Sequence, residues 1–174
     1  MFASMVQNDI DELRQNFDAM YIGAIPQLLA EDGAFLAFLA TLTGTEALAG
    51  FFAPEQGVGQ RFVRFIELFF PDAYAPHVNA IWNFRNTMVH SFNPGPFTLT
   101  FHQSRLHLTV QNGQVTLNAE DFYSALVTAS QRYFELLSHD VALQAAFTKR
   151  LNDKEGGGVQ SFVVEQIKVS GGAA

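Results

Sequence analysis

The sequence predicts a mainly α-helical domain with a small antiparallel sheet inserted between its helices. Apolar residues recur every three or four positions over residues 5–92 and 119–151, which is the period of a helix packed on one side. Between these stretches, apolar and polar residues alternate over 97–117, as expected for strands with one buried face. With 174 residues, 48% of them hydrophobic, and 18 phenylalanines, the chain can build one core of interleaved rings.

Three helices are expected in the first 52 residues. The first covers about 20 residues from residue 5 and ends near Gly23 and Pro26, with acids in its first half that suit the helix dipole. The second covers 32–42 and is apolar on most sides, so we expect it to be buried. A break at 43–45 then separates it from a short helix that Thr45 caps and that runs to residue 52.

Two more helices precede the alternating segment. After a loop at 54–59, a helix over 60–70 carries Arg61 and Arg64 opposite its apolar residues. Pro76 suits the first turn of the next helix, which runs to His90. The segment 93–96, Asn-Pro-Gly-Pro, then ends that helix, because proline lacks the N–H and clashes with the preceding turn.

Residues 97–117 are predicted to form a three-stranded antiparallel β-meander. Asn112-Gly113 is the preferred pair for a two-residue hairpin turn, and a second turn is expected at Gln103-Ser104. Every apolar residue then lies opposite another one, so that one face packs on the helices. The implied pairs are Val110 with Val115, Leu108 with Leu117, Phe101 with Leu106, Leu99 with Leu108 and Phe97 with Val110.

The remaining segments complete the domain. Asn118 is expected to cap a helix that runs to about residue 138, and Asp140 a last helix to about 151. Residues 1–153 are thus one domain. Residues 154–174 form a flexible or strand-forming tail, with a glycine linker at 155–158 and a candidate strand, or crossing to a partner, at 162–169.

Composition excludes several kinds of site. The chain has no cysteine, hence no disulfide or thiolate zinc site, and it has neither a glycine-rich phosphate loop nor a nucleophile elbow. His102 and His107 are interpreted as surface histidines, so we expect no metal and no cofactor. No leader and no run of about 18 uncharged apolar residues occurs, so the expectation is a soluble cytoplasmic protein with no membrane contact.

Charge is spread unevenly along the chain. The net charge is −7, yet residues 57–110 carry four arginines against two acids. An acidic protein is a poor non-specific binder of nucleic acid. Any polyanionic partner is therefore expected to meet this central segment, although such a distribution also arises on ordinary solvated surfaces.

A polar group stands at the end of the helix that stops at residue 92. Asn86 and His90 are four residues apart and share a face, whereas Arg85 lies about 140° around the axis from His90. Only the length of the arginine side chain would bring its guanidinium toward the imidazole. The alternative is that Arg85 and His90 are structural groups that cap the helix or pair with acids.

The segment Arg85-Asn86-Thr87-Met88-Val89-His90 resembles the signature of the HEPN family (higher eukaryotes and prokaryotes nucleotide-binding domains), an arginine followed after four to six residues by a histidine. The resemblance covers about residues 5–92 and the helix at 119–138, and the β-meander is an insertion relative to a minimal HEPN bundle. It implies a HEPN-like helical bundle that works as a metal-independent endoribonuclease. Two copies of the motif would then line one cleft of a homodimer.

The resemblance also implies a role for each residue. Cleavage of RNA by its own 2′-hydroxyl needs a base, an acid and a cation. His90 would move the protons, Arg85 would hold the phosphate, and Asn86 would orient His90 or the phosphate. Arg61 and Arg64 would bind the RNA backbone. A second copy and RNA or a nucleotide are the expected partners, with an antitoxin or other protein as a further one in a toxin or defence role. The alternative function is a non-catalytic HEPN-like module that binds a nucleotide or a protein.

Overall fold

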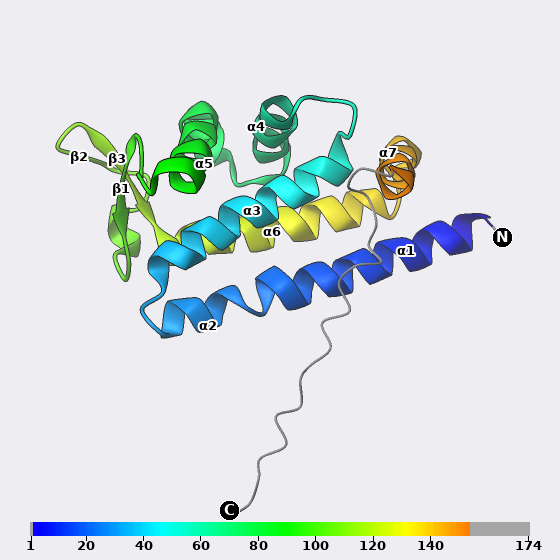
Figure 1. Ribbon diagram of the computed structural model, residues 1–174, viewed down its shortest axis with the longest axis horizontal. Coiled ribbons are helices and arrows are strands. Elements are labelled where there is room, and N and C mark those ends of the chain that lie inside the picture. Colours follow the sequence, from blue (N-terminus) through cyan, green and yellow to red (C-terminus); the bar gives the residue numbers. More distant parts are fainter. Residues whose placement is uncertain (1, 154–174) are drawn as a thin grey trace, which may run out of the picture.

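The structure is a computed structural model that describes residues 2–153 (Figure 1). It is mainly helical, with a small mixed sheet at one end. Helices α3 and α6 run side by side through the centre; α1 and α2 lie along one side of them, and α4 and α5 cross the other side (Figure 1). The helices are α1 (Phe2–Phe17), α2 (Ile25–Ala30), α3 (Ala34–Phe52), α4 (Val58–Phe69), α5 (Val78–Ser91), α6 (Ala119–Leu137) and α7 (Val141–Asn152).

The first helix and its continuation agree in part with the sequence. Helix α1 ends in a π-helical turn at Asp18–Ile22, where the N–H of Gly23 donates to the Asp18 carbonyl at 2.7 Å. The expected helix of about 20 residues is confirmed. The short helix α2, which has Pro26 in its first turn, is missing from the sequence expectation.

The predicted break at 43–45 is wrong, because α3 runs without interruption. The hydroxyl of Thr45 donates to the Thr41 carbonyl at 2.8 Å inside the helix, so Thr45 caps nothing. Gly44 is a packing position, since a Cβ there would lie 3.0 Å from Cδ1 of Tyr21. Helix α3 packs against α2, α4, α5, α6 and α7, and these contacts outweigh the weak helix propensity of glycine and threonine.

Phenylalanine rings form the centre of the core, as the composition predicts. The ring of Phe84 on α5 lies 5.8 Å from that of Phe38 on α3 and 5.5 Å from that of Phe97 in the sheet, measured between centroids. Phe122 of α6 lies 6.1 Å from Phe38. All four rings are buried, and these contacts join the sheet to the helices.

The sheet is not an antiparallel meander. Its order is β1 (Phe97–Thr100), β3 (Gln114–Asn118), β2 (Val110–Gln111), and β1 runs parallel to β3. The hairpin of β2 and β3 is confirmed with Val110 opposite Val115, but Leu99 pairs with Leu117 and a 3₁₀ turn at Ser104–Leu106 replaces the first hairpin. Alternation with period two is the same for parallel and antiparallel neighbours, so the sequence pattern does not distinguish them.

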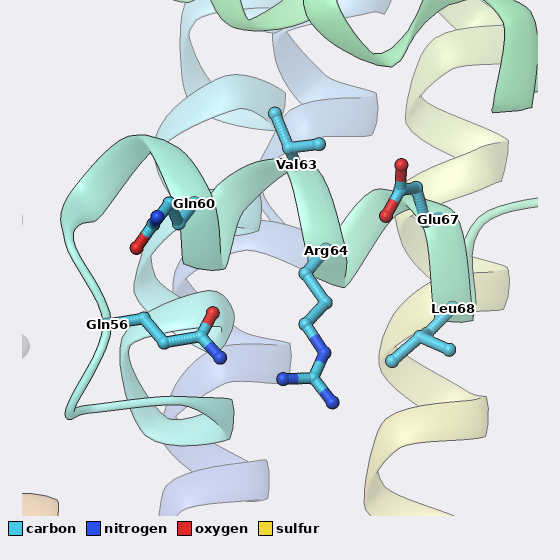
Figure 2. A pocket seen from close by; sticks show the side chains of 6 residues that line it. All are labelled: Gln56, Gln60, Val63, Arg64, Glu67 and Leu68. Carbon is cyan, nitrogen blue, oxygen red and sulfur yellow. The ribbon is translucent and has the colours of Figure 1, made fainter.

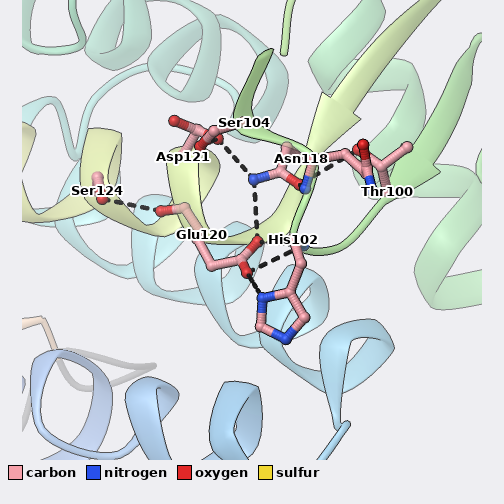
Figure 3. Close-up of polar contacts among 8 residues, drawn as sticks. Thr100, His102, Ser104, Asn118, Glu120, Asp121 and Ser124 are labelled. Atoms are coloured by element: carbon pink, nitrogen blue, oxygen red, sulfur yellow. Dashed lines mark hydrogen bonds and ion pairs between the residues drawn. The ribbon is translucent and has the colours of Figure 1, made fainter. Parts of the chain in front are cut away.

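Asn118 holds the crossover between β1 and β2 and does not cap α6 through its side chain. Its buried amide accepts a hydrogen bond from the backbone N–H of Gln103 at 3.0 Å, and its Nδ2 donates to Glu120 at 2.9 Å and to Asp121 at 2.6 Å (Figure 3). The predicted cap at Asp140 is confirmed, since its Oδ1 accepts from the N–H of Leu143 at 2.9 Å.

Within residues 2–153, α3 is the one helix long and apolar enough to cross a membrane by length and composition. More than half of that stretch is buried inside the protein, as in a core helix of a soluble protein. The expected linker and strand of the tail at 154–174 lie outside the described residues.

Candidate functional site

Arg85 lies in the middle of α5 and points toward α3. Its Nε donates to Oε2 of Glu46 at 2.5 Å, and its Nη1 donates to Oδ1 of the neighbouring Asn86 at 3.2 Å. The guanidinium also lies over the ring of Trp82, with Cζ 5.5 Å from the centroid. These three contacts hold the Arg85 side chain in one orientation.

Three arginines from three helices line one open cavity of about 380 Å³, which we call the arginine pocket. Arg61 comes from α4, Arg85 from α5 and Arg150 from α7, while α3 supplies the rest of the wall. The pocket therefore exists only where four helices meet. Its lining residues are Thr43, Glu46, Ala47, Gly50, Phe51, Arg61, Arg85 and Arg150.

Two of the guanidinium groups lie beside Gly50 of α3. A methyl group placed on Gly50 would lie 3.8 Å from Nε of Arg150 and 3.9 Å from Cζ of Arg61. Both guanidinium groups lie within 4 Å of this one point, so they are neighbours and lie against the same stretch of α3. Two like charges held this close favour an anion between them.

Arg61 is the least satisfied group of the pocket. Its Nε is buried and has no hydrogen-bond partner within the described part of the chain. Burial lowers the pKa of Arg61, and the charge of Arg150 lowers it further, while Glu46 opposes this effect. A guanidinium in such a place is stabilised by an oxyanion that accepts its free N–H groups.

The pocket carries a positive charge. Its lining holds three arginines and a single carboxylate, Glu46, so the lining groups sum to +2. Arg150 also pairs with Asp153 through Nη1 and Oδ2 at 3.5 Å, but Asp153 does not line the pocket and about half of its side chain is exposed. Solvent screening weakens that pair relative to the half-buried Arg85–Glu46 pair.

His90 lies outside the arginine pocket. It is exposed in the last turn of α5, and no hydrogen bond or ion pair to it occurs within residues 2–153. The helix ends as predicted: Phe92 follows with a left-handed φ of 51°, and Asn93 accepts from the N–H of Gly95. One subunit therefore presents the imidazole of His90 and the guanidinium of Arg85 in different surroundings, and Asn86 contacts Arg85.

Arg61 and Arg64 also separate. Arg64 lies in a second groove along α4 (Figure 2). Its guanidinium carbon Cζ is 5.6 Å from the ring centroid of Phe52. This groove has no other cation in its lining, and Glu67 offsets the charge of Arg64. The residues that line it are Gln56, Gln60, Val63, Arg64, Glu67 and Leu68. Of Arg61 and Arg64, therefore, only Arg61 contributes to the arginine pocket.

Sequence reasoning missed Glu46, Gly50 and Arg150. One signal for Glu46 was present, because it is the only charged residue of α3. A lone carboxylate in a buried helix needs a cation from another element. Nothing in the sequence marks Arg150 as a neighbour of Arg61, since 89 positions separate them and helical period alone does not say which faces meet.

The pocket has the chemistry of an oxyanion site. Guanidinium groups bind phosphate or carboxylate oxygens through paired N–H donors, and three of them converge here. No histidine lines the pocket, so its own groups can hold an oxyanion but offer no base near neutral pH. Among the described residues, no three His, Asp or Glu side chains gather as metal ligands would.

No protein-family model, curated protein or solved structure matches this chain. The resemblance of the Arg85–His90 segment to the HEPN signature therefore stays a prediction.

Proposed function

We propose that this chain binds the phosphate group of RNA or of a nucleotide in the arginine pocket. The observation that carries the proposal is the convergence of Arg61, Arg85 and Arg150 on one open cavity with a single carboxylate. The chain as a whole has a net charge of −7, so this local excess of cations is not a general surface property. Binding there is directed by paired N–H donors and not by diffuse charge.

Binding of labelled single-stranded RNA and of adenosine monophosphate tests this proposal directly. We expect Arg61→Gln and Arg85→Gln to weaken both by about tenfold or more. Arg64→Gln is the matched control, because it removes the same charge from the same helix outside the pocket. Equal losses from Arg61→Gln and Arg64→Gln would show that only net charge matters, and no binding by the unaltered protein would remove the proposal.

A second candidate function is metal-independent RNA cleavage by a homodimer, as the HEPN resemblance implies. The observation that favours it is His90, which stands exposed and unpaired within the described residues on the same helix as Arg85. Because His90 does not line the pocket of its own chain, a second copy would have to bring an imidazole to the bound phosphate. An antitoxin or other protein partner would belong to this function.

Incubation with labelled RNA in EDTA tests cleavage, with His90→Ala as the comparison. We expect the unaltered protein to cut and the variant to lose most of that activity while it keeps RNA binding. Arg85→Lys should lose activity too, because lysine cannot form the two-pronged contact. Cleavage that survives His90→Ala, or a strict monomer in sedimentation at micromolar concentration, would argue against the homodimeric nuclease.

A further inference from the structure

We infer that the arginine pocket selects a phosphomonoester dianion, the terminal phosphate of a nucleotide or of an RNA end, over the singly charged phosphodiester inside a strand. This inference rests on the proposed phosphate-binding function and names its substrate class. Three observations support it: the charge of the lining, the number of guanidinium groups, and the burial of one donor.

The charge of the lining matches a dianion. Three arginines and Glu46 sum to +2, and the half-exposed Asp153 outside the lining offsets only part of the charge of Arg150. A phosphomonoester carries about −1.5 to −2 at pH 7, because its second pKa is near 6, whereas each internal phosphate of RNA carries one negative charge. A phosphodiester would thus leave one cation of the pocket uncompensated, and repulsion between neighbouring guanidinium groups is larger where solvent is partly excluded.

The number of donors points the same way. A terminal phosphate presents three acceptor oxygens, the same number as the arginines of the lining. An internal phosphodiester has two unesterified oxygens. One guanidinium of the pocket would then face an ester oxygen, which is a weaker acceptor, and would lose a charge-assisted hydrogen bond.

The buried donor favours a chain end. Nε of Arg61 is buried and lacks an acceptor in the described residues. A group that reaches this atom must displace the side chains that cover it. A terminal phosphate can do so as the tip of one substituent, whereas an internal phosphate brings a sugar on each side. The unsatisfied donor is thus better supplied by a monoester.

Calorimetry with two small ligands tests the selection on the unaltered protein. Adenosine monophosphate is the monoester, and its phosphate methyl ester is the diester with the same base and sugar. We expect the monoester to bind about tenfold tighter or more at pH 7.5. The difference should shrink as the pH falls below about 6, where the monoester gains a proton.

Labelled RNA with a 5′-phosphate or a 5′-hydroxyl extends the test to strand ends. Tighter binding of the phosphorylated strand alone assigns the pocket to RNA ends, and a monoester preference seen only with the mononucleotide assigns it to free nucleotides; both results support the inference. Arg61→Gln should abolish the preference and Arg64→Gln should preserve it. Equal affinity for monoester and diester, both lost in Arg61→Gln, would overturn the selection while leaving phosphate binding intact. Absence of binding by every ligand would overturn both.

Discussion

Glu46 of α3 and Arg85 of α5 form a hydrogen-bonded ion pair, with Nε 2.5 Å from Oε2, at the wall of the arginine pocket. About a fifth of each side chain is exposed, so the pair is neither free on the surface nor sealed in the core. Glu46 is the only carboxylate of the lining. It therefore orients Arg85 and at the same time competes with any anion for that guanidinium.

Glu46→Gln should tighten phosphate binding. The variant removes the competing charge and raises the sum of the lining charges by one, while the amide oxygen still accepts from Nε of Arg85. We expect a gain of about three- to tenfold in the affinity for adenosine monophosphate at low salt, measured by calorimetry. Glu31→Gln, an exposed acid after α2, is the control and should leave the affinity unchanged. Weaker binding by Glu46→Gln would contradict the prediction and would mean that Glu46 acts mainly by orienting Arg85, not by competing with the anion.

Two glycines of α3 should respond in opposite ways to alanine. At Gly50 the new Cβ has its nearest neighbours at 3.8–3.9 Å, which is ordinary contact, so the gain in helix propensity should stabilise the protein by up to about 1 kcal/mol. At Gly44 the Cβ would lie 3.0 Å from Tyr21 and 3.2 Å from Leu126, and overpacking should give a net loss of about 1–2 kcal/mol. Urea unfolding of the two variants checks the sign of each. Destabilisation of equal size at both positions would contradict this difference in packing between Gly44 and Gly50.

Two variants of Asp140 should separate the effect of its capping hydrogen bond on the stability of the protein from the effect of its negative charge. Asp140 accepts from the N–H of Leu143 at 2.9 Å, and Asp140→Ala should lower the free energy of unfolding by about 1 kcal/mol. Asp140→Asn keeps the acceptor and should retain most of the stability. Thermal unfolding of the two variants distinguishes them. An equal loss in both would assign the effect of Asp140 to its charge at the helix end and not to the hydrogen bond.

The free energy of unfolding should fall in mild acid because of His107, which lies beside the sheet. Its Nδ1 accepts from the backbone N–H of Asn118 at 3.1 Å and its Nε2 lies 2.8 Å from the hydroxyl of Tyr74, which donates to a carbonyl oxygen at 3.2 Å. The neutral ring with its proton on Nε2 fits these contacts, so His107 is not the surface histidine that the sequence suggests. Burial lowers the pKa of His107, and His77 adds to this effect while the charge of Asp121 opposes it.

The sign of the pH effect follows from that lowered pKa. Below the unfolded value of about 6.5 the unfolded chain binds the proton more readily than the folded one, so this contribution to stability is present above that pH and is lost as the pH falls through the lower folded value. Urea midpoints at about pH 7.5 and 5.5 measure it. His107→Asn keeps an acceptor near Asn118, so its urea midpoint should fall less between about pH 7.5 and 5.5 than that of the unaltered protein. His139→Asn changes an exposed position, and its midpoint should fall as much as that of the unaltered protein. Identical decreases in all three proteins would exclude His107 as the cause.

Much of the local structure is readable from the residues alone. Helical period places α4, α5 and α6 to within a few residues, because each has one apolar side that must be buried. Asp140 marks the start of α7, and Asn112-Gly113 marks the hairpin with Val110 opposite Val115. In each of these cases the physical cause lies within a few residues of its effect.

The sequence by itself thus determined α4, α5, α6 and α7, the core of phenylalanine rings and the hairpin. Tertiary packing alone decided that α3 continues through Gly44, that β1 pairs with β3 in parallel, and that Arg61, Arg85 and Arg150 share a pocket with Glu46. Periodicity tells which face of an element is buried but not which other element covers it. The arginine pocket depends on four helices that are distant in sequence, so only their arrangement in space brings its charges together.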